Sequence, residues 1–284
     1  MKSLTRKTLS SNSSMSFKKV FFLFIFFQFS LSLFSQIKLC SWNLENFGKS
    51  KSDSAIDFIA NTLKPFDVVA IVEVVAGNGG AQAVARLVDV LDQKGFDWDY
   101  CISDPTSGST NSSERYAFLW KTSRLKKLGR AWLDSCYQSE IEREPYFADF
   151  IFEGKIFTAG AFHAVPKNKQ PETEIKYFKF LPEKYPTKTF IFSGDFNCPE
   201  SHTVFNPLKG LLYKPIFTNQ KTSLKRECVS DECLASEYDN IFYNSTKIKF
   251  SKSGVIHFYK SFTSLQSART VSDHLPVYFE FFLN

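Results

Sequence analysis

The sequence predicts an α/β fold in which mixed β-sheets carry helices on their outer faces. Short apolar runs rich in Phe, Ile, Val and Tyr dominate the chain, and runs of this composition favour β-strands. Two segments near the beginning instead repeat their apolar residues at helical spacing. Helices early in a chain and strands later are typical of sheets with helices packed outside. No repeat or long Pro/Gly/Ser linker divides the 284 residues, so we expect one domain over residues 36–284.

Residues 1–35 are predicted to form a secretory signal peptide. Lys18 and Lys19 precede an apolar run from Val20 to Phe34, and small residues follow. The alternative is an uncleaved anchor, but the run is shorter than the roughly 20 residues of a membrane-spanning helix. We therefore expect the domain to be secreted or periplasmic after cleavage near Ser35 or Gln36, with no stable membrane span.

Cleavage would change the charge of the protein. The full chain carries a net charge of +6, and the first 35 residues contain five Lys and Arg and no acid, so the remainder carries +1. A domain of such small net charge has no general basic field to hold a polyanion. Any binding of phosphate must therefore come from local groups.

All six cysteines lie beyond the predicted signal peptide, where export permits disulfides. Cys228 and Cys233 stand close together in the polar stretch KRECVSDECLASE and are placed to staple a loop, although spacing alone does not fix the pairing. No histidine lies near these cysteines, which argues against a structural metal site.

The predicted strands follow one another as QIKLCSW, DVVAIV, YAFLW, YFADFIF, KIFTAGAF, TFIFSG, NIFY and VYFEFFL. YFADFIF and KIFTAGAF are expected to pair as a hairpin that turns at Glu153, Gly154 and Lys155. Helices are expected over residues 52–64, before Pro65, and over residues 79–95, with Gly95 as the C-cap. Their apolar faces are Ile56, Ile59, Ala60 and Leu63 in the first and Val84, Leu87, Val88 and Leu91 in the second.

Polar residues stand where the predicted strands begin or end. Those at carboxyl ends are Asn43, Glu73, His163, Asp195 and Asn197, and those at amino ends are Glu114, Asp239, Asp273 and His274. A single Asp or His in such a place is usually a turn residue or a solvated cap. In antiparallel pairing, however, the end of one strand lies beside the start of its neighbour. The joint pattern therefore predicts that these groups gather at one edge of the sheets.

Such a set of groups suits the hydrolysis of a phosphate diester. The reaction needs neutralisation of the phosphate charge, an activated water and protonation of the leaving oxygen. The oxygens of Glu73, Asp273 and Asn43 suit Mg²⁺, with Ca²⁺ or Mn²⁺ as alternatives. Two acid–histidine pairs would supply one base and one acid. In GDFN, Asp195 and Asn197 are expected to point the same way on an extended chain, after a tight turn at Gly194.

The motifs SWNLENFG, IVEVV, SERYAFLW, EREPYFADF, FHAVP, SGDFNCP, YDNIFY and SDHLPV occur in this order. In this respect the chain resembles the endonuclease/exonuclease/phosphatase superfamily, and within it the deoxyribonuclease I branch, from about residue 37 to 282. The resemblance implies a four-layered sandwich of two central mixed sheets flanked by helices. It also implies a monomeric, divalent-metal nuclease that cuts double-stranded DNA with little sequence preference and leaves 5′-phosphate ends.

The resemblance also implies roles for individual residues. Catalytic roles fall to Glu114 with His163, to Asp239 with His274, and to Asp195. Arg143 and Asn197 would bind phosphate, and Asn43, Glu73 and Asp273 would serve the metal. Two positions depart from the deoxyribonuclease I pattern: Ser112 replaces a tyrosine, and Val75 replaces an arginine, that reach the minor groove in that branch. Their absence predicts weaker, more salt-sensitive cutting of duplex DNA.

Two other function classes fit parts of the sequence. A phosphatase or a sphingomyelinase-like phospholipase of the same superfamily would keep GDFN and SDH without needing SERY or REP. The basic and aromatic stretch 245–266 is compatible with a membrane-acting enzyme, although a solvated strand pair explains it as well. A non-catalytic binding module of the same fold is the remaining alternative, and it is disfavoured because every expected catalytic position is filled.

Overall fold

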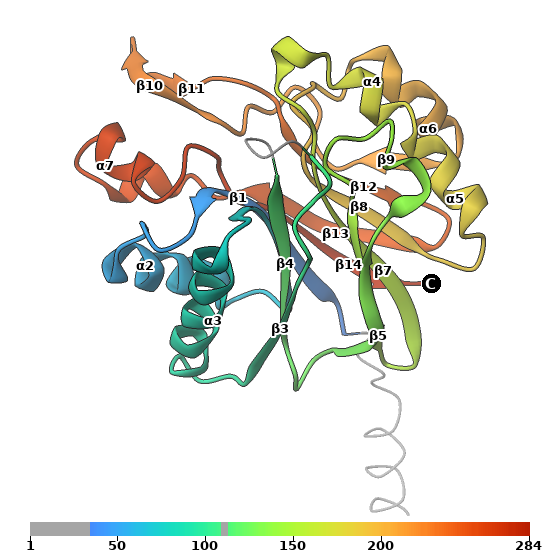
Figure 1. Ribbon diagram of the computed structural model, residues 1–284, viewed down its shortest axis with the longest axis horizontal. Helices are drawn as coiled ribbons and strands as arrows, with labels where there is room; N and C mark the ends of the chain where they lie inside the picture. The colour runs from blue at the N-terminus through green and yellow to red at the C-terminus, as the bar shows by residue number, and fades with distance from the viewer. Residues whose placement is uncertain (1–34, 109–112) are drawn as a thin grey trace, which may run out of the picture. The chain divides into compact units, whose positions relative to one another are not determined.

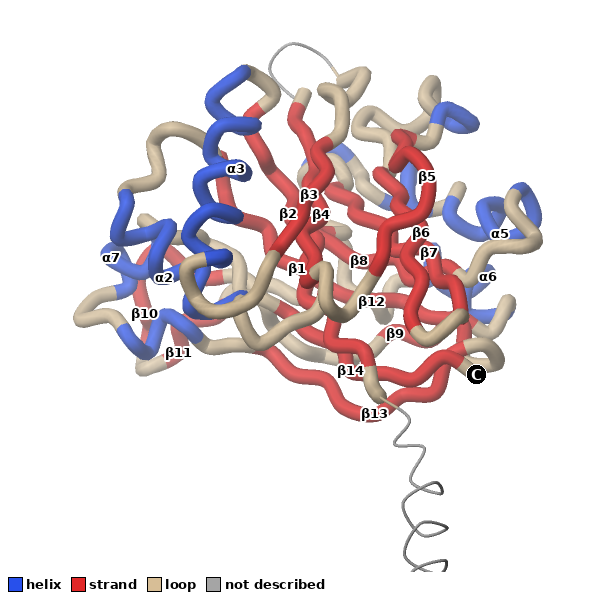
Figure 2. Tube along the Cα trace, turned by 90° about the horizontal axis from the view of Figure 1, so that it is seen from below, coloured by secondary structure: helices blue, strands red, loops and turns tan. Residues whose placement is uncertain are grey.

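Two six-stranded mixed sheets form the centre of the protein (Figures 1 and 2). The computed structural model describes residues 35–108 and 113–284. The first sheet has the order β13 (Ile248–Val255), β14 (Val277–Leu283), β1 (Ile37–Phe47), β2 (Val68–Val75), β4 (Glu114–Lys121) and β3 (Trp98–Ile102). The second has the order β5 (Lys126–Leu133), β6 (Tyr146–Phe152), β7 (Lys155–His163), β8 (Phe190–Asp195), β12 (Asp239–Asn244) and β9 (Tyr213–Pro215). The pairs β1–β2 and β7–β8 are parallel, and the other neighbours are antiparallel.

Helices cover the outer face of each sheet, which gives the four layers that the sequence predicted (Figure 1). The first sheet carries α2 (Asp53–Leu63), α3 (Asn78–Asp92) and α7 (Leu265–Arg269), and the second carries α4 (Glu172–Ile175), α5 (Leu181–Lys184) and α6 (Asn206–Gly210). Single 3₁₀ turns lie at η1 (Ser135–Tyr137), η2 (Lys167–Lys169), η3 (Phe178–Phe180), η4 (Thr203–Phe205) and η5 (Phe258–Ser261). In the described residues no helix is long and apolar enough to span a bilayer.

Three apolar cores hold the layers together. One lies between the two sheets and includes stacked rings such as Phe279 and Phe281, whose centroids are 4.8 Å apart. The others lie under the helices on either side, around Trp42 in the first sheet and Phe192 in the second. All three cores are built from residues 37–283. The stretch from Gln36 to Asn284 therefore contains everything that buries its apolar side chains, and it forms one compact unit.

Both predicted helices form with the predicted faces buried. The α2 helix starts where the Ser52 hydroxyl accepts a hydrogen bond from the Ala55 N–H at 3.2 Å, a standard N-cap. The α3 helix ends earlier than expected, because the cap is Gln93 rather than Gly95. Gly95 instead has a φ of +103° in the turn that follows, where its amide bonds to the Asp92 carbonyl.

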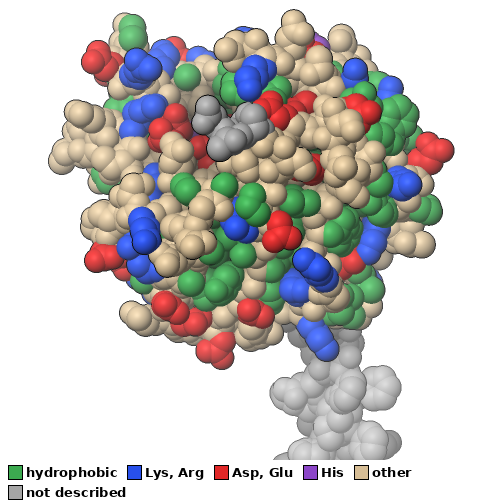
Figure 3. Space-filling model, in the orientation of Figure 1, with side chains coloured by type: hydrophobic (Ala, Val, Ile, Leu, Met, Phe, Trp, Pro, Cys, Tyr) green, Lys and Arg blue, Asp and Glu red, His purple; other side chains and the backbone are tan. Residues whose placement is uncertain are grey.

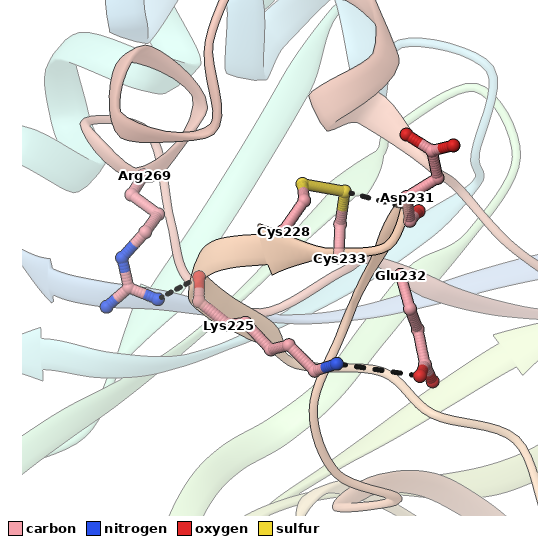
Figure 4. Close-up of a disulfide and its surroundings, with 6 residues drawn as sticks. All are labelled: Lys225, Cys228, Asp231, Glu232, Cys233 and Arg269. Carbon is pink, nitrogen blue, oxygen red and sulfur yellow. Dashed lines mark hydrogen bonds and ion pairs between the residues drawn. A yellow bond between two sulfur atoms is a disulfide. The ribbon is translucent and has the colours of Figure 1, made fainter.

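The predicted hairpin between β6 and β7 is confirmed, since Phe152 pairs with Lys155 across the turn. A further hairpin, β10 (Leu224–Val229) with β11 (Glu232–Leu234), extends away from the sheets (Figure 1). Figure 4 shows the disulfide between Cys228 and Cys233 that closes it, as the spacing of these cysteines suggested. Lys225 lies 3.5 Å from Glu232 beside this disulfide. The remaining four cysteines, Cys40, Cys101, Cys136 and Cys198, are free thiols.

Candidate active site

The pairing of β7, β8 and β12 brings three predicted catalytic residues side by side. His163 is the last residue of β7 and lies in register with Asp195, the last residue of parallel β8. Asp195 in turn faces Asp239, the first residue of antiparallel β12. His274 arrives just before β14, in a bridge with Ser223. The expected gathering at one edge of the sheets is thus formed by the strand register itself.

The first sheet contributes Asn43, Glu73 and Glu114. Asn43 and Glu73 lie inside β1 and β2 rather than after them, because both strands continue for a few residues past the site. Glu73 has a φ of +61°, and the β2–β4 register shifts between Ile71 and Val74. This bulge turns the Glu73 carboxylate towards Asn43, which donates its amide to it at 2.8 Å.

The first acid–histidine pair joins Glu114 and His163. The Nδ1 atom of His163 lies 2.9 Å and 3.1 Å from the two carboxylate oxygens of Glu114. Arg143 donates to the same carboxylate at 3.1 Å, and both Arg143 and Asn197 donate to the Ala164 carbonyl. Burial would lower the pKa of His163, but the charge and hydrogen bond of Glu114, together with the Asp195 carboxylate, raise this pKa above its ordinary value.

The second pair joins Asp239 and His274. The His274 Nδ1 atom lies 2.7 Å from Asp239 Oδ2, and the Thr222 hydroxyl donates to this same oxygen at 2.7 Å. Burial again opposes the charged imidazole, but the carboxylates of Asp239 and Asp195 hold the pKa of His274 well above its ordinary value. In both pairs the carboxylate occupies Nδ1, so the Nε2 atom is the one that faces the site.

Asp195 lies between the two imidazoles. Its Oδ2 atom is 3.5 Å from the Nε2 atoms of both His163 and His274, and it also accepts the Asn43 amide at 3.1 Å. Burial would raise the pKa of Asp195, but the two histidines and its hydrogen bonds lower it. One buried carboxylate therefore connects the two pairs.

These groups line a pocket of about 550 Å³. Its wall includes Glu73, Glu114, Arg143, His163, Asp195, Asn197 and His274. The structure thus brings seven of the ten predicted site residues to one pocket. Asn43 and Asp239 stand directly behind it, bonded to lining residues, and Asp273 lies beside it, with an oxygen 3.9 Å from the His274 Nε2 atom.

The donor set fits a hard cation. Glu45, Glu73 and Asp273 lie close enough that, besides burial, the other two carboxylates raise the pKa of Glu45. A divalent cation would relieve this crowding of negative charge, and carboxylate and amide oxygens are its preferred ligands. Asp195, Asp239 and His274 also place possible ligand atoms within 4.8 Å of one another. Asp239 and His274 already bond to each other, which leaves the Glu73 side as the better fit, although Asp273 there pairs with Arg269 at 3.2 Å.

Comparison with known proteins shows the family of the chain. Residues 40–274 match the sequence model of the Endonuclease/Exonuclease/phosphatase family. The chain belongs to this family. It is 28% identical over 270 residues to "Deoxyribonuclease gamma" of Rattus norvegicus, covering 86% of this chain and 84% of that protein. It is 27% identical over 265 residues to "Deoxyribonuclease" of a Thioalkalivibrio strain, covering 86% and 70%.

A solved structure confirms the fold. An endonuclease/exonuclease/phosphatase family protein from Bacteroides thetaiotaomicron superposes with a TM-score of 0.65 at 16% identity, covering 88% of this chain and 98% of that one. The protein is therefore a phosphodiesterase of the endonuclease/exonuclease/phosphatase family, homologous to deoxyribonucleases and built as the same four-layered sandwich.

Within this family fold, two expectations about the GDFN motif are wrong. Asp195 and Asn197 do not share a face of an extended chain, because the Asn197 amide turns back to Asp195 Oδ1 at 2.9 Å with a φ of +49°. Gly194 serves close packing rather than a turn, since a Cβ there would lie 1.9 Å from the Phe162 carbonyl oxygen of β7. Of the two departing positions, Val75 lies on the pocket wall and Ser112 falls outside the described residues.

Three further residues support the site but were not identified from the sequence. Thr222 fixes Asp239, and Glu45 adds charge beside Glu73. Glu174, buried in α4, accepts hydrogen bonds from the Glu142 and Val165 amides and so ties the segment before Arg143 to the loop after His163. Only Glu45 carried a usable signal, because it stands two residues after Asn43 in SWNLENFG.

Proposed function

We propose that the protein is a secreted, divalent-metal-dependent DNA endonuclease that hydrolyses phosphodiester bonds to 5′-phosphate products. One observation carries the proposal: two acid–histidine pairs direct their Nε2 atoms at the same buried carboxylate, 3.5 Å from each, on the wall of one pocket. Paired imidazoles on either side of one reacting centre are what a displacement at phosphorus needs, with one proton removed and one delivered.

The residues divide the reaction between them. One imidazole takes a proton from the attacking water, and the other gives a proton to the 3′ oxygen as its bond to phosphorus breaks. Asp195 orients the water between them, while Arg143 and Asn197 hold non-bridging phosphate oxygens. Glu73, Asn43 and Asp273 would hold Mg²⁺, which neutralises charge on the phosphate when bound.

Two features of the chain support the assignment of a secreted protein. A lysine pair and a 15-residue apolar run precede the domain, and the Cys228–Cys233 disulfide fits an oxidising compartment. The apolar run lies in residues 1–34, outside the described part of the chain.

The phospholipase alternative gains little from stretch 245–266. The exposed aromatic residue of this stretch, Phe250, pairs with Phe281 near the end of β14. That end of the strand is the one farther from His274, which precedes β14. Phe258 is buried under the helices of the first sheet. The stretch therefore does not present an aromatic membrane-binding hairpin beside the pocket.

The proposal is tested with purified residues 36–284 on supercoiled plasmid. We expect Mg²⁺-dependent nicking that EDTA abolishes, with 3′-hydroxyl and 5′-phosphate ends that DNA ligase reseals. A parallel panel of a phosphate monoester, sphingomyelin and single-stranded DNA separates the alternatives. Hydrolysis of the monoester or lipid without nicking would move the protein to another branch of its family.

Duplex affinity is tested in the same assay. Val75 gives the pocket wall no cation, so nicking should fall steeply as salt rises, and Val75→Arg should reduce that fall. Undiminished nicking by the unmodified protein at high salt would show that other groups hold the duplex.

A further inference from the structure

The end of the two sheets opposite the pocket, here called the far end, has a distinct surface. It is formed where β1, β2, β7, β8 and β13 begin and where β4, β6, β12 and β14 finish. Lys155 of the second sheet donates to the Leu283 carbonyl of the first at 2.8 Å, and the Asn284 amide bonds to the Lys247 carbonyl at 3.0 Å. The two sheets are therefore tied into one surface there.

Lysines crowd this end without partners of opposite charge. The exposed ones are Lys126, Lys155, Lys247, Lys249 and Lys252. In the described ranges 35–108 and 113–284, no ion pair joins any of them to a carboxylate. Lys155 and Lys247 donate only to neutral backbone carbonyls. Figure 3 shows Lys and Arg side chains interspersed with Asp and Glu side chains on the lower part of the face in view. Exposed carboxylates also lie at this end, on Glu153 in the β6–β7 turn and on Asp97 and Asp99 at the start of β3, and the five lysines outnumber them.

Large apolar side chains are exposed among these lysines. Ile156 is 50% exposed, Leu212 53% and Phe250 45%. Leu212 also has a φ of +66°, a left-handed conformation that is unfavourable for a non-glycine residue. Its carbonyl is fixed by the Ser245 amide at 2.9 Å, and its side chain points into solvent all the same.

Protection of sheet edges explains only part of this surface. Lysines on the edge strands β5 and β13 discourage pairing with another sheet, which accounts for Lys126, Lys249 and Lys252. Lys155 lies on β7 inside its sheet and Lys247 lies in a turn, so neither blocks an edge. Exposed Ile, Leu and Phe side chains would also make edge protection worse. Exposed lysines together with exposed large apolar side chains are typical of a surface that binds a partner.

We propose that the far end docks reversibly on an anionic lipid bilayer. Each lysine near such a surface contributes about 1 kcal/mol, or roughly fivefold in partitioning, and apolar side chains add to this by entering the headgroup region. The described chain enters the fold at this end, because Gln36 bonds to Ser251 and Glu280. The proposal does not depend on the DNA endonuclease activity.

Docking in this way would leave the catalytic pocket free. The pocket lies at the other end of the strands, which for 7–11 residues is roughly 25–35 Å away. Substrate would reach His163 and His274 from the aqueous side, without passing the lipid.

The test is co-sedimentation of residues 36–284 with vesicles of phosphatidylglycerol and phosphatidylcholine, against phosphatidylcholine alone. We expect binding to the anionic vesicles only, weakened by salt because the contact is electrostatic. Lys155→Glu/Lys247→Glu/Lys249→Glu should lose on the order of 100-fold or more in partitioning, from about fivefold per lysine. Ile156→Ser/Phe250→Ser should weaken binding on the order of tenfold without a change in charge.

The matched control is Lys176→Glu/Lys184→Glu/Lys260→Glu, which makes the same charge change at exposed lysines elsewhere. It should keep most of the binding, and circular dichroism should show all variants folded. Equal loss in the control, equal binding to neutral vesicles or no binding at all would overturn the proposal. Loss of duplex binding in place of vesicle binding would assign the surface to nucleic acid.

Discussion

The two acid–histidine pairs are built alike but surrounded differently. In each, a buried carboxylate faces Nδ1, and Nε2 lies 3.5 Å from Asp195. Glu114 contacts its histidine with both oxygens and shares one with Arg143. Asp239 uses a single oxygen, at 2.7 Å, and shares it with a neutral hydroxyl. One pair therefore includes a permanent cation and the other does not.

This difference teaches how one site can hold both a proton acceptor and a proton donor. Burial lowers the pKa of both histidines, and carboxylates raise it above the ordinary value in both. For His163 the effect of Glu114 and Asp195 is partly offset by Arg143, whereas for His274 the carboxylates of Asp239, Asp195 and Asp273 raise the pKa further. His274 should keep its proton more firmly than His163. We therefore expect His163 to take the proton from water and His274 to protonate the leaving oxygen.

The largest expected effect comes from removing either imidazole. His163→Ala and His274→Ala, assayed separately by plasmid nicking, should each lower the rate about 10²–10⁴-fold, since a positioned acid or base contributes that much. His202→Ala is the matched control, because His202 is exposed and only caps η4. A variant that nicks DNA at a near-normal rate would remove its histidine from the chemistry.

Replacing Arg143 should separate the pairs by pH. Arg143→Met removes a charged contact to phosphate, so the rate should fall about 10–100-fold. It also removes a cation that lowers the pKa of His163, so this pKa rises further. A base works only when deprotonated, and the acidic limb of the rate–pH profile should therefore move to higher pH.

The control for this shift is Lys169→Met, which also replaces a positively charged residue paired with a glutamate, here Glu142, by methionine. Its acidic limb should stay in place. An acidic limb that stays in place while the basic limb moves to higher pH in Arg143→Met would reverse the assignment of base and acid.

A substrate with a good leaving group should sharpen the assignment further. The leaving phenolate of bis(4-nitrophenyl) phosphate needs little protonation, so the deficit of His274→Ala should shrink by about tenfold or more relative to DNA. The deficit of His163→Ala should not shrink. Steady-state rates on both substrates decide the point, and the opposite pattern would exchange the two roles.

The smallest effect is expected from the hydroxyl behind Asp239. Thr222→Val deletes one hydrogen bond to that carboxylate, worth about 1 kcal/mol or roughly fivefold in rate, and leaves the Tyr238 and Asp239 amides short of a partner. Thr222→Ser keeps the hydroxyl and should restore both activity and resistance to urea. Equal activity in all three proteins would show that Asp239 needs no such support.

The sequence predicted most of the site because strand ends carry it. Glu114, His163, Asp195 and Asp239 each begin or end a strand with a strong apolar pattern, and register does the rest. Thr222 was out of reach, since it lies in a loop before a polar hairpin that has no such pattern. The one-turn helices α4, α5 and α6 are likewise too short to show a period.

The far end was recognisable only in part. The basic and aromatic character of stretch 245–266 stood out, but its nearness to Lys155, Ile156 and Leu212 depends on pairings between strands far apart in the chain. Long-range register of this kind leaves no mark on local composition.

The bulge at Glu73 separates the residues of the reaction centre from Val75, which follows it on the wall of the pocket. Past this kink Val74 is buried, while Val75 stands at the mouth of the pocket with its backbone pinned against Gly80. A longer side chain at position 75 would extend outward without entering a core. A substitution at position 75 can therefore alter the wall of the pocket while leaving the two acid–histidine pairs unchanged.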